Sequence, residues 1–146
     1  MMRYVIQDVE HEKVPLELEL AYLVHYVELQ KIRLSEKVDV RMNIEGDPKP
    51  YEIPPMILVP FIENAFKYGT SSHENAAIRM DLKIRGGVMT FKVSNQIFTG
   101  REKPETFGIG IQNTRQRLNL IYPGRHKLVL SNNGKVFIAN LDIYLA

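Results

Sequence analysis

The sequence predicts an α+β domain in which helices cover one face of a mixed, mostly antiparallel sheet. Segments with helical and strand periodicity alternate in the order helix, strand, helix, two strands, helix, two strands. Each of the two predicted strand pairs encloses a hairpin signal, at Gly86-Gly87 and at Asn132-Asn133-Gly134. The chain has 146 residues, of which 45% are hydrophobic and 25% charged, and these values suit one domain with a buried core.

The composition excludes several kinds of site. The chain contains no cysteine, so disulfides, thiolate nucleophiles and thiolate metal sites are excluded. A net charge of +2 does not by itself indicate nucleic-acid binding, although it is compatible with phosphate ligands. The longest strongly apolar run, residues 56–62, is far shorter than the roughly 20 residues that span a bilayer, and residues 1–13 contain no signal-peptide core. We therefore expect a soluble chain that makes no membrane contact.

The first predicted elements are a helix over residues 16–34 and a strand over residues 36–46. Pro15 stands before the helix and glutamates follow in its first turn, and both features favour a helix start. Six apolar residues recur in the helix at helical spacing: Leu16, Leu20, Leu23, Val24, Val27 and Leu34. Apolar residues alternate with polar ones in the strand, which is typical of a half-buried strand: Val38, Val40, Met42 and Ile44. A turn-rich connector over residues 46–55 follows.

The second predicted helix covers residues 55–69 and is closed by Gly69. Its apolar residues fall within one arc of about 140°: Leu58, Phe61, Ile62, Ala65 and Phe66. Three polar residues and a proline are expected on the opposite side: Glu63, Asn64, Lys67 and Pro60. A proline inside a helix costs roughly 3 kcal/mol unless its surroundings compensate. We expect its missing N–H to face the polar side, where a ligand or another segment could lie.

The polar side of this helix has two interpretations. Glu63 and Lys67 could form an ordinary surface pair worth a few tenths of a kcal/mol, with Asn64 as a bystander. Alternatively, the three residues could form a small site. In that site Asn64 offers a neutral oxygen to a hard cation such as Mg²⁺, Lys67 offers positive charge to a phosphate, and Glu63 offers a carboxylate to a water or a proton. The helix alone does not choose between them.

Four strands and a helix complete the predicted domain: strands 77–85 and 88–95, a polar loop over 96–108, a helix over 109–122 and a hairpin over 126–145. Asn95 ends the second of these strands. Its amide could pair with both the donor and the acceptor edge of a purine. Asn at a strand end is also a common turn former, so this residue alone does not identify a site.

Gly108 and Gly110 stand at the start of the third predicted helix. Glycines there let the backbone approach a ligand, and the free N–H groups of a helix start attract anions. A flexible loop-to-helix junction would have the same pattern. The segment lacks the features of a P-loop and of the dinucleotide-binding fingerprint. Asn113 and Arg117, with Arg115 nearby, could contact phosphates or simply face water.

Three segments, in this order, resemble the N, G1 and G2 boxes of the GHKL ATP-binding superfamily, which includes DNA gyrase B, MutL and the sensor histidine kinases: PFIENAFKYG (60–69), FKVSNQ (91–96) and GIGIQNTRQRLNLIYPG (108–124). The first and third are most similar to the P-x-x-E-N-A-x-K-[HY]-G and G-I-G-x-x-N-x-R-x-R-L segments of the LytS-like branch of histidine kinases. The resemblance covers about residues 14–146. It implies a two-layer α/β sandwich of the GHKL (Bergerat) type, with ATP and Mg²⁺ as cofactors.

The resemblance also implies one nucleotide site made by the following residues: Asn64, Lys67, Tyr68, Asn95, Gly108, Gly110, Ile111, Asn113 and Arg117. In that site Asn64 would coordinate Mg²⁺, Lys67 would act on the phosphates, and residues 96–107 would form a lid over ATP. Glu63 matches an acidic position that activates water in the ATPase relatives, so Glu63 and Lys67 are the implied catalytic residues. Asn95 stands where many relatives have an Asp that contacts the adenine amino group, and the residues after it lack the usual glycine pair of the G1 box.

The resemblance further implies the domain organisation. Residues 1–13 would be the end of a dimerisation and phosphoacceptor hairpin or a linker, and residues 14–146 the ATP-binding catalytic domain. The His-Phe segment of the phosphoacceptor helix is absent from this sequence. The chain would therefore be the cytoplasmic, catalytic part of a larger, membrane-bound sensor kinase. It would transfer the γ-phosphate of ATP to a histidine on a separate domain and act indirectly on a response regulator.

Two alternatives remain open. One is a GHKL ATPase module with Glu63 as general base. The other is a non-catalytic interaction module that has lost ATP binding, which the unusual G1 region and Asn95 motivate.

Overall fold

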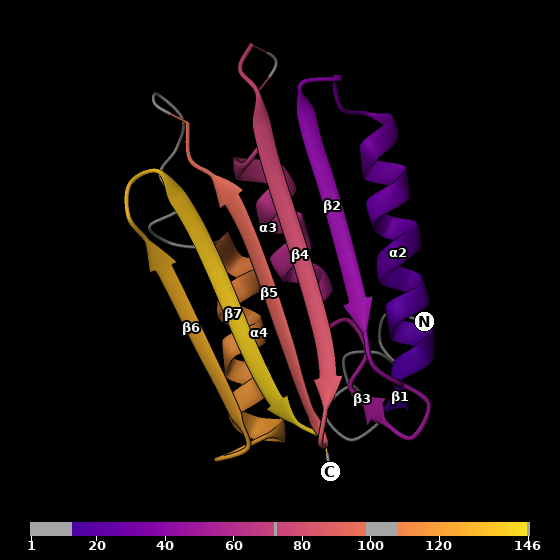
Figure 1. Ribbon diagram of the computed structural model, residues 1–146. Coiled ribbons are helices and arrows are strands. Elements are labelled where there is room, and N and C mark those ends of the chain that lie inside the picture. The colour runs from indigo at the N-terminus through magenta and orange to yellow at the C-terminus, as the bar shows by residue number, and fades with distance from the viewer. Residues whose placement is uncertain (1–12, 72, 99–107, 146) are drawn as a thin grey trace.

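A computed structural model describes residues 13–71, 73–98 and 108–145. Figure 1 shows a sheet with the helices gathered on one side, and α3 and α4 lie directly behind its strands. The five strands run in the order β2-β4-β5-β7-β6, with β2 parallel to β4 and the other pairs antiparallel. The helices and these strands have the following bounds: α2 Leu16–Ile32, α3 Val59–Tyr68, α4 Gly108–Ile121, β2 Val38–Glu45, β4 Ala76–Arg85, β5 Val88–Gln96, β6 His126–Asn132 and β7 Val136–Tyr144. The predicted α+β class and the predicted order of these elements are confirmed.

The core lies between the helices and the sheet. Alternate residues of the three central strands are buried beneath the helices: Ile78, Met80, Leu82, Met89, Phe91, Val93, Phe137, Ala139, Leu141 and Ile143. Phe61 of α3 meets Phe91 of β5 edge to face, with ring centroids 6.4 Å apart. The other face of the sheet is polar, and there the Arg79 guanidinium lies 2.9 Å from the Asp39 carboxylate. This division explains the alternating pattern of the strands.

Both predicted hairpins are present. Gly86 and Gly87 adopt φ values of 59° and 78°, so each occupies the left-handed region that a two-residue hairpin turn requires. Gly134 also has a positive φ, of 88°, in the turn that joins β6 to β7. Glycine tolerates these angles without a steric penalty, which is why the two turn signals were reliable.

α2 follows Pro15 directly and ends at Ile32, close to the predicted range. Its acidic first turn and Lys31 in its last turn complement the helix dipole. Four aliphatic residues of the helix are buried: Leu16, Leu20, Leu23 and Val27. No helix in the described part of the chain is both long and apolar enough to cross a membrane.

The structure contains one small feature that the sequence did not predict. β1 (Val14–Pro15) pairs antiparallel with β3 (Glu52–Ile53), and the Leu16 N–H donates to the Tyr51 carbonyl at 2.9 Å. This pair ties the start of α2 to the connector that precedes α3. Strands of two residues show no periodicity, so no sequence pattern predicted them.

α3 begins later than predicted. Residues 55–58 form a turn, and the helix starts at Val59, so Pro60 lies in its first turn. N–H groups of the first turn have no partner within the helix, and a proline there loses no hydrogen bond. Pro60 is therefore not an interior proline, and the cost of roughly 3 kcal/mol does not apply to it. Met56, within the turn, has a φ of 62° and is the one non-glycine residue with a positive φ among those described.

Candidate functional site

α3 carries the first group of predicted site residues, and these residues differ in exposure. Glu63 and Lys67 are exposed, whereas Asn64 is only 7% exposed. Asn64 follows Pro60 by one helical turn, so both belong to one side of α3. Asn64 is therefore covered by surrounding residues, whereas Glu63 and Lys67 are not.

Glu63 and Lys67 make no ion pair with each other in the described structure. The Lys67 ammonium instead lies 5.1 Å from the centre of the Tyr68 ring, within the range of a cation–π contact. Tyr26 of α2 is partly buried, and this burial, followed by the negative charge of Glu63, raises the pKa of its phenol. The negative charge of Glu63 therefore influences Tyr26 of α2, whereas Lys67 and Tyr68 lie in the last turn of α3.

The end of α3 lies against the end of β5. A Cβ atom added to Gly69 would come within 2.5 Å of the Asn95 Cβ. The Asn95 side chain is 2% exposed, and its Nδ2 donates to the Gln96 carbonyl at 3.0 Å. The structure thus brings Asn95 to the end of the helix that carries Asn64, Lys67 and Tyr68, as the predicted site requires.

The start of α4 lies against the start of α3. Gly110 is exposed, and a Cβ atom there would meet only the Pro60 Cβ, at the ordinary distance of 3.4 Å, among the described residues. Packing against these residues therefore does not require a glycine at this position. Gly108 is the first residue of the helix, and Asn113, one turn further on, is exposed. Ile111 is 1% exposed and packs in the core, so it supports the site from beneath.

Arg117 makes contacts that the sequence analysis did not predict. Its guanidinium donates to the Pro55 carbonyl at 3.0 Å and to the Met56 carbonyl at 3.4 Å. It therefore holds the turn before α3. Glu19 of α2 binds the same turn, since the Met56 N–H donates to its carboxyl at 2.8 Å. The sequence analysis did not single out Glu19, which stands among the glutamates expected at a helix start.

Two buried amides of the predicted site, one in α3 and one in β5, each have an unused hydrogen-bonding atom. Asn64 Nδ2 and Asn95 Oδ1 are buried and have no partner within the described residues. Buried polar atoms are almost always paired in folded proteins, so an unpaired one indicates a position that a ligand or water completes. An amide supplies both a neutral oxygen for a hard cation and a hydrogen-bonding edge for a base. The unpaired Asn64 Nδ2 is a donor and fits a phosphate or water oxygen, whereas the unpaired Asn95 Oδ1 is an acceptor and fits an amino group such as that of adenine. A Mg²⁺ ion would be held by the Asn64 oxygen.

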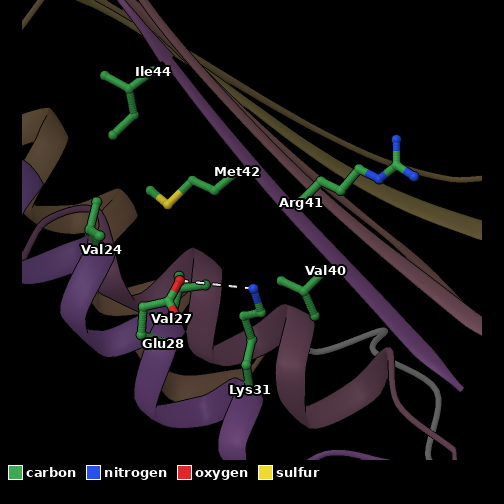
Figure 2. Close-up of a pocket in the computed structure, with 8 residues that line it drawn as sticks. All are labelled: Val24, Val27, Glu28, Lys31, Val40, Arg41, Met42 and Ile44. Atoms are coloured by element: carbon green, nitrogen blue, oxygen red, sulfur yellow. Dashed lines mark ion pairs between the residues drawn. The ribbon is translucent and has the colours of Figure 1, made fainter. Parts of the chain in front are cut away.

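A separate groove lies between α2 and β2. It has a volume of about 550 Å³ and is lined by α2 and β2 (Figure 2): Val24, Val27, Glu28, Lys31, Val40, Arg41, Met42 and Ile44. Its walls are mainly aliphatic, and Glu28 and Lys31 form an ion pair of 3.8 Å at its side. None of the predicted site residues lines it. The predicted lid falls mostly on residues 99–107, which lie outside the described residues.

Comparison with known proteins gives consistent matches. The family model for histidine kinases matches residues 1–38. The sensor histidine kinase YesM of Bacillus subtilis is 30% identical over 103 residues, which are 67% of this chain and 18% of YesM. The sensor protein kinase HptS of Staphylococcus aureus is 32% identical over 85 residues, or 58% of this chain and 15% of HptS. The chain thus spans less than a fifth of the length of these relatives.

Solved structures share the fold. The histidine kinase domain of the blue-light activated histidine kinase EL346 of Erythrobacter litoralis has a TM-score of 0.63 and 20% identity, covering 92% of this chain and 67% of that one. The catalytic domain of the histidine kinase ThkA has a TM-score of 0.60 and 16% identity, covering 92% and 96%. The fold is therefore that of a histidine kinase catalytic domain. The sequence matches show that the chain belongs to the histidine kinase family, and the match to YesM is consistent with the LytS-like branch.

Proposed function

We propose that this chain is the ATP-binding catalytic domain of a sensor histidine kinase. It transfers the γ-phosphate of ATP to a histidine on a separate domain of the parent protein. The observation that carries this proposal is that two buried amides, Asn64 in α3 and Asn95 in β5 beside the end of α3, each have a hydrogen-bonding atom without a partner within the described residues. The family matches support the same reaction class.

Each residue of the site has a distinct role in this proposal. The Asn64 side-chain oxygen would hold Mg²⁺, which neutralises charge on the phosphates when it is bound. Lys67, with its ammonium beside the Tyr68 ring, would contact the same phosphates. Asn95 Oδ1 would accept a hydrogen bond from the adenine amino group.

The start of α4 would receive the phosphates. Its first N–H groups carry partial positive charge, and the exposed Gly110 leaves room for an anion to approach the backbone. Phosphoryl transfer depends mainly on positioning and on charge neutralisation, so the protein need not form a covalent bond itself. In the reaction, the bond from the γ-phosphorus to the departing ADP oxygen breaks while a histidine nitrogen forms a new bond to that phosphorus.

Calorimetry with Mg²⁺ and a non-hydrolysable ATP analogue tests the proposal. We expect the wild-type chain to bind, and the Asn64→Ala variant to bind at least about tenfold more weakly, which is a loss of about 1.4 kcal/mol. Asn43→Ala is a matched control, because Asn43 is an exposed amide whose Nδ2 bonds only to Glu45. Absence of binding by the wild type would contradict the proposal and favour the non-catalytic interaction module.

Transfer itself needs the acceptor. We propose that residues 1–13 are the end of a dimerisation and phosphoacceptor segment, and that the parent kinase presents its histidine to this domain on the cytoplasmic side of a membrane. A response regulator would receive the phosphate from that histidine. Labelled phosphate from ATP should reach an added phosphoacceptor domain of the parent protein with the wild type and not with Asn64→Ala. Steady ATP hydrolysis without any acceptor, lost in Glu63→Ala, would instead favour the ATPase alternative.

A further inference from the structure

The turn that precedes α3 is held from two sides. From α2, the Glu19 carboxyl accepts a hydrogen bond from the Met56 N–H at 2.8 Å. From α4, the Arg117 guanidinium donates to the Pro55 and Met56 carbonyls at 3.0 and 3.4 Å. Three consecutive polar groups of one turn are thus bonded to side chains of two different helices. The sequence separations, 37 residues for Glu19 and 61 or 62 for Arg117, show that only tertiary structure creates this arrangement.

The arrangement includes a buried acid and a backbone conformation that is unfavourable by itself. Glu19 is 5% exposed, and burial raises the pKa of its carboxyl, while the N–H groups of Met56 and Ile57 and the charge of Arg117 act in the opposite direction. Burying a carboxyl is costly unless hydrogen bonds compensate. Met56 adopts a φ of 62°, which costs a non-glycine residue of order 1 kcal/mol. Such features persist only where the surrounding structure maintains them.

The turn leads directly into the site. α3 starts at Val59, three residues after Met56, and Asn64 follows in its second turn. α4 contacts both α3 and the turn before it: Gly110 lies against Pro60, and Arg117, two turns later, binds the turn. Two contacts at different heights along α4 limit both the tilt and the sliding of α3 relative to α4.

We propose that Glu19 and Arg117 are positioning residues of the nucleotide site. They fix the turn at residues 55–58 so that Asn64 is held opposite the first turn of α4. The effect on nucleotide binding rests on the proposed function, whereas the effect on Asn64 does not. In this proposal Arg117 acts through the turn and does not contact phosphate. Through Glu19, α2 is connected to the nucleotide site, although none of the proposed nucleotide-binding residues belongs to α2.

Two measurements on a series of variants test the proposal. The series is Arg117→Met, Arg117→Lys, Glu19→Ala and Glu19→Gln. Gln can still accept the Met56 hydrogen bond, and Lys can still donate to one carbonyl. Arg125→Met and Glu17→Ala are matched controls: Arg125 donates to a carbonyl outside the turn, at Tyr144, and Glu17 is an exposed acid in the first turn of α2.

The first measurement is the NMR signal pair of the Asn64 side-chain amide in the nucleotide-free protein. We expect it to shift in Arg117→Met and in Glu19→Ala, to shift less in the two conservative variants, and to stay in place in both controls. The second is the affinity for Mg²⁺ with the ATP analogue. We expect about a tenfold loss in Arg117→Met, with part of it restored in Arg117→Lys. A general loss of structure would instead move signals throughout the spectrum, and the conservative variants are chosen to avoid it.

Each result either supports or overturns the positioning role. Unmoved Asn64 signals in both Arg117→Met and Glu19→Ala would overturn it, whatever happens to affinity. Weaker binding with unmoved Asn64 signals would indicate that Arg117 contacts phosphate directly. If the wild type binds no nucleotide, the proposed function fails, but a shift of the Asn64 signals in the variants and not in the controls still supports the positioning of α3.

Discussion

The α carbon of Gly69 lies directly against the side chain of Asn95, so that a Cβ atom on Gly69 would be 2.5 Å from the Asn95 Cβ. Gly69 ends α3 with a φ of −101°, which any residue can adopt. The glycine is therefore required by the close approach of α3 to β5 and not by its backbone angles. This approach also brings Asn95 to the C-terminal end of the helix that carries Asn64.

Gly69→Ala should destabilise the domain. The added methyl group would also lie 2.6 Å from the Ala65 carbonyl oxygen, so the end of α3 or the Asn95 side chain must move. We expect a loss of about 2 kcal/mol in the free energy of unfolding, measured with urea, which is typical of overpacking. Full stability of the variant would show that α3 and β5 are further apart than described.

Gly110→Ala should have the opposite effect on stability. Gly110 lies within α4, where alanine favours the helix by up to about 1 kcal/mol, and its Cβ would meet the Pro60 Cβ only at ordinary contact distance. We expect a higher unfolding temperature than that of the wild type together with weaker binding of the ATP analogue. If binding is unchanged, the backbone at Gly110 does not approach the phosphates.

Met56→Gly should stabilise the domain. Glycine adopts a φ of 62° without the steric penalty that methionine has, and only part of that gain is lost to the greater freedom of the unfolded chain. We expect the free energy of unfolding to rise by about 0.5 kcal/mol. Met56→Ala is the matched control, since it removes the same side chain and keeps the penalty. A glycine variant no more stable than the alanine variant would contradict this explanation.

Asp39 provides a prediction about pH. The hydrogen bond from Arg79, at 2.9 Å, lowers the pKa of the Asp39 carboxyl, and the nearby charge of Arg41 acts in the same direction. A lowered pKa means that this carboxylate stabilises the folded state above its unfolded pKa, and that the contribution is lost as the pH falls through the folded pKa. In Arg79→Met, NMR titration of the carboxyl carbon should give a pKa closer to the ordinary value. Lys83→Met, on the same strand, should leave the Asp39 pKa unchanged.

The sequence predicted the elements whose pattern is local. The periodicity of α2, the alternation in β2 and the glycine turns of the two hairpins depend on neighbouring residues, and all of them are confirmed. The helical wheel placed Asn64 opposite the apolar arc but did not predict its burial, because a wheel cannot tell which neighbour covers a residue. What covers it depends on tertiary packing.

The buried polar groups were the least predictable part. Glu19 was interpreted only as one of the glutamates that favour a helix start, and Arg117 as a residue that contacts phosphate or faces water, yet both bind the turn at Met56. Both contacts depend on the packing of three helices, which no residue spacing in the sequence predicts. The resemblance of the motifs singled out α3 and α4, but could not separate residues that would touch a ligand from residues that hold those helices.

The short β1–β3 pair has a mechanical consequence. Because Val14 pairs with Ile53, and Glu19 binds Met56 a few residues further on, the connector into α3 is attached twice to the chain around the start of α2. Tension applied to the chain just before Val14 would therefore load this connector before it reached the five-stranded sheet. The force would pass along the chain into α2, which follows Pro15 directly, and through the paired connector into α3.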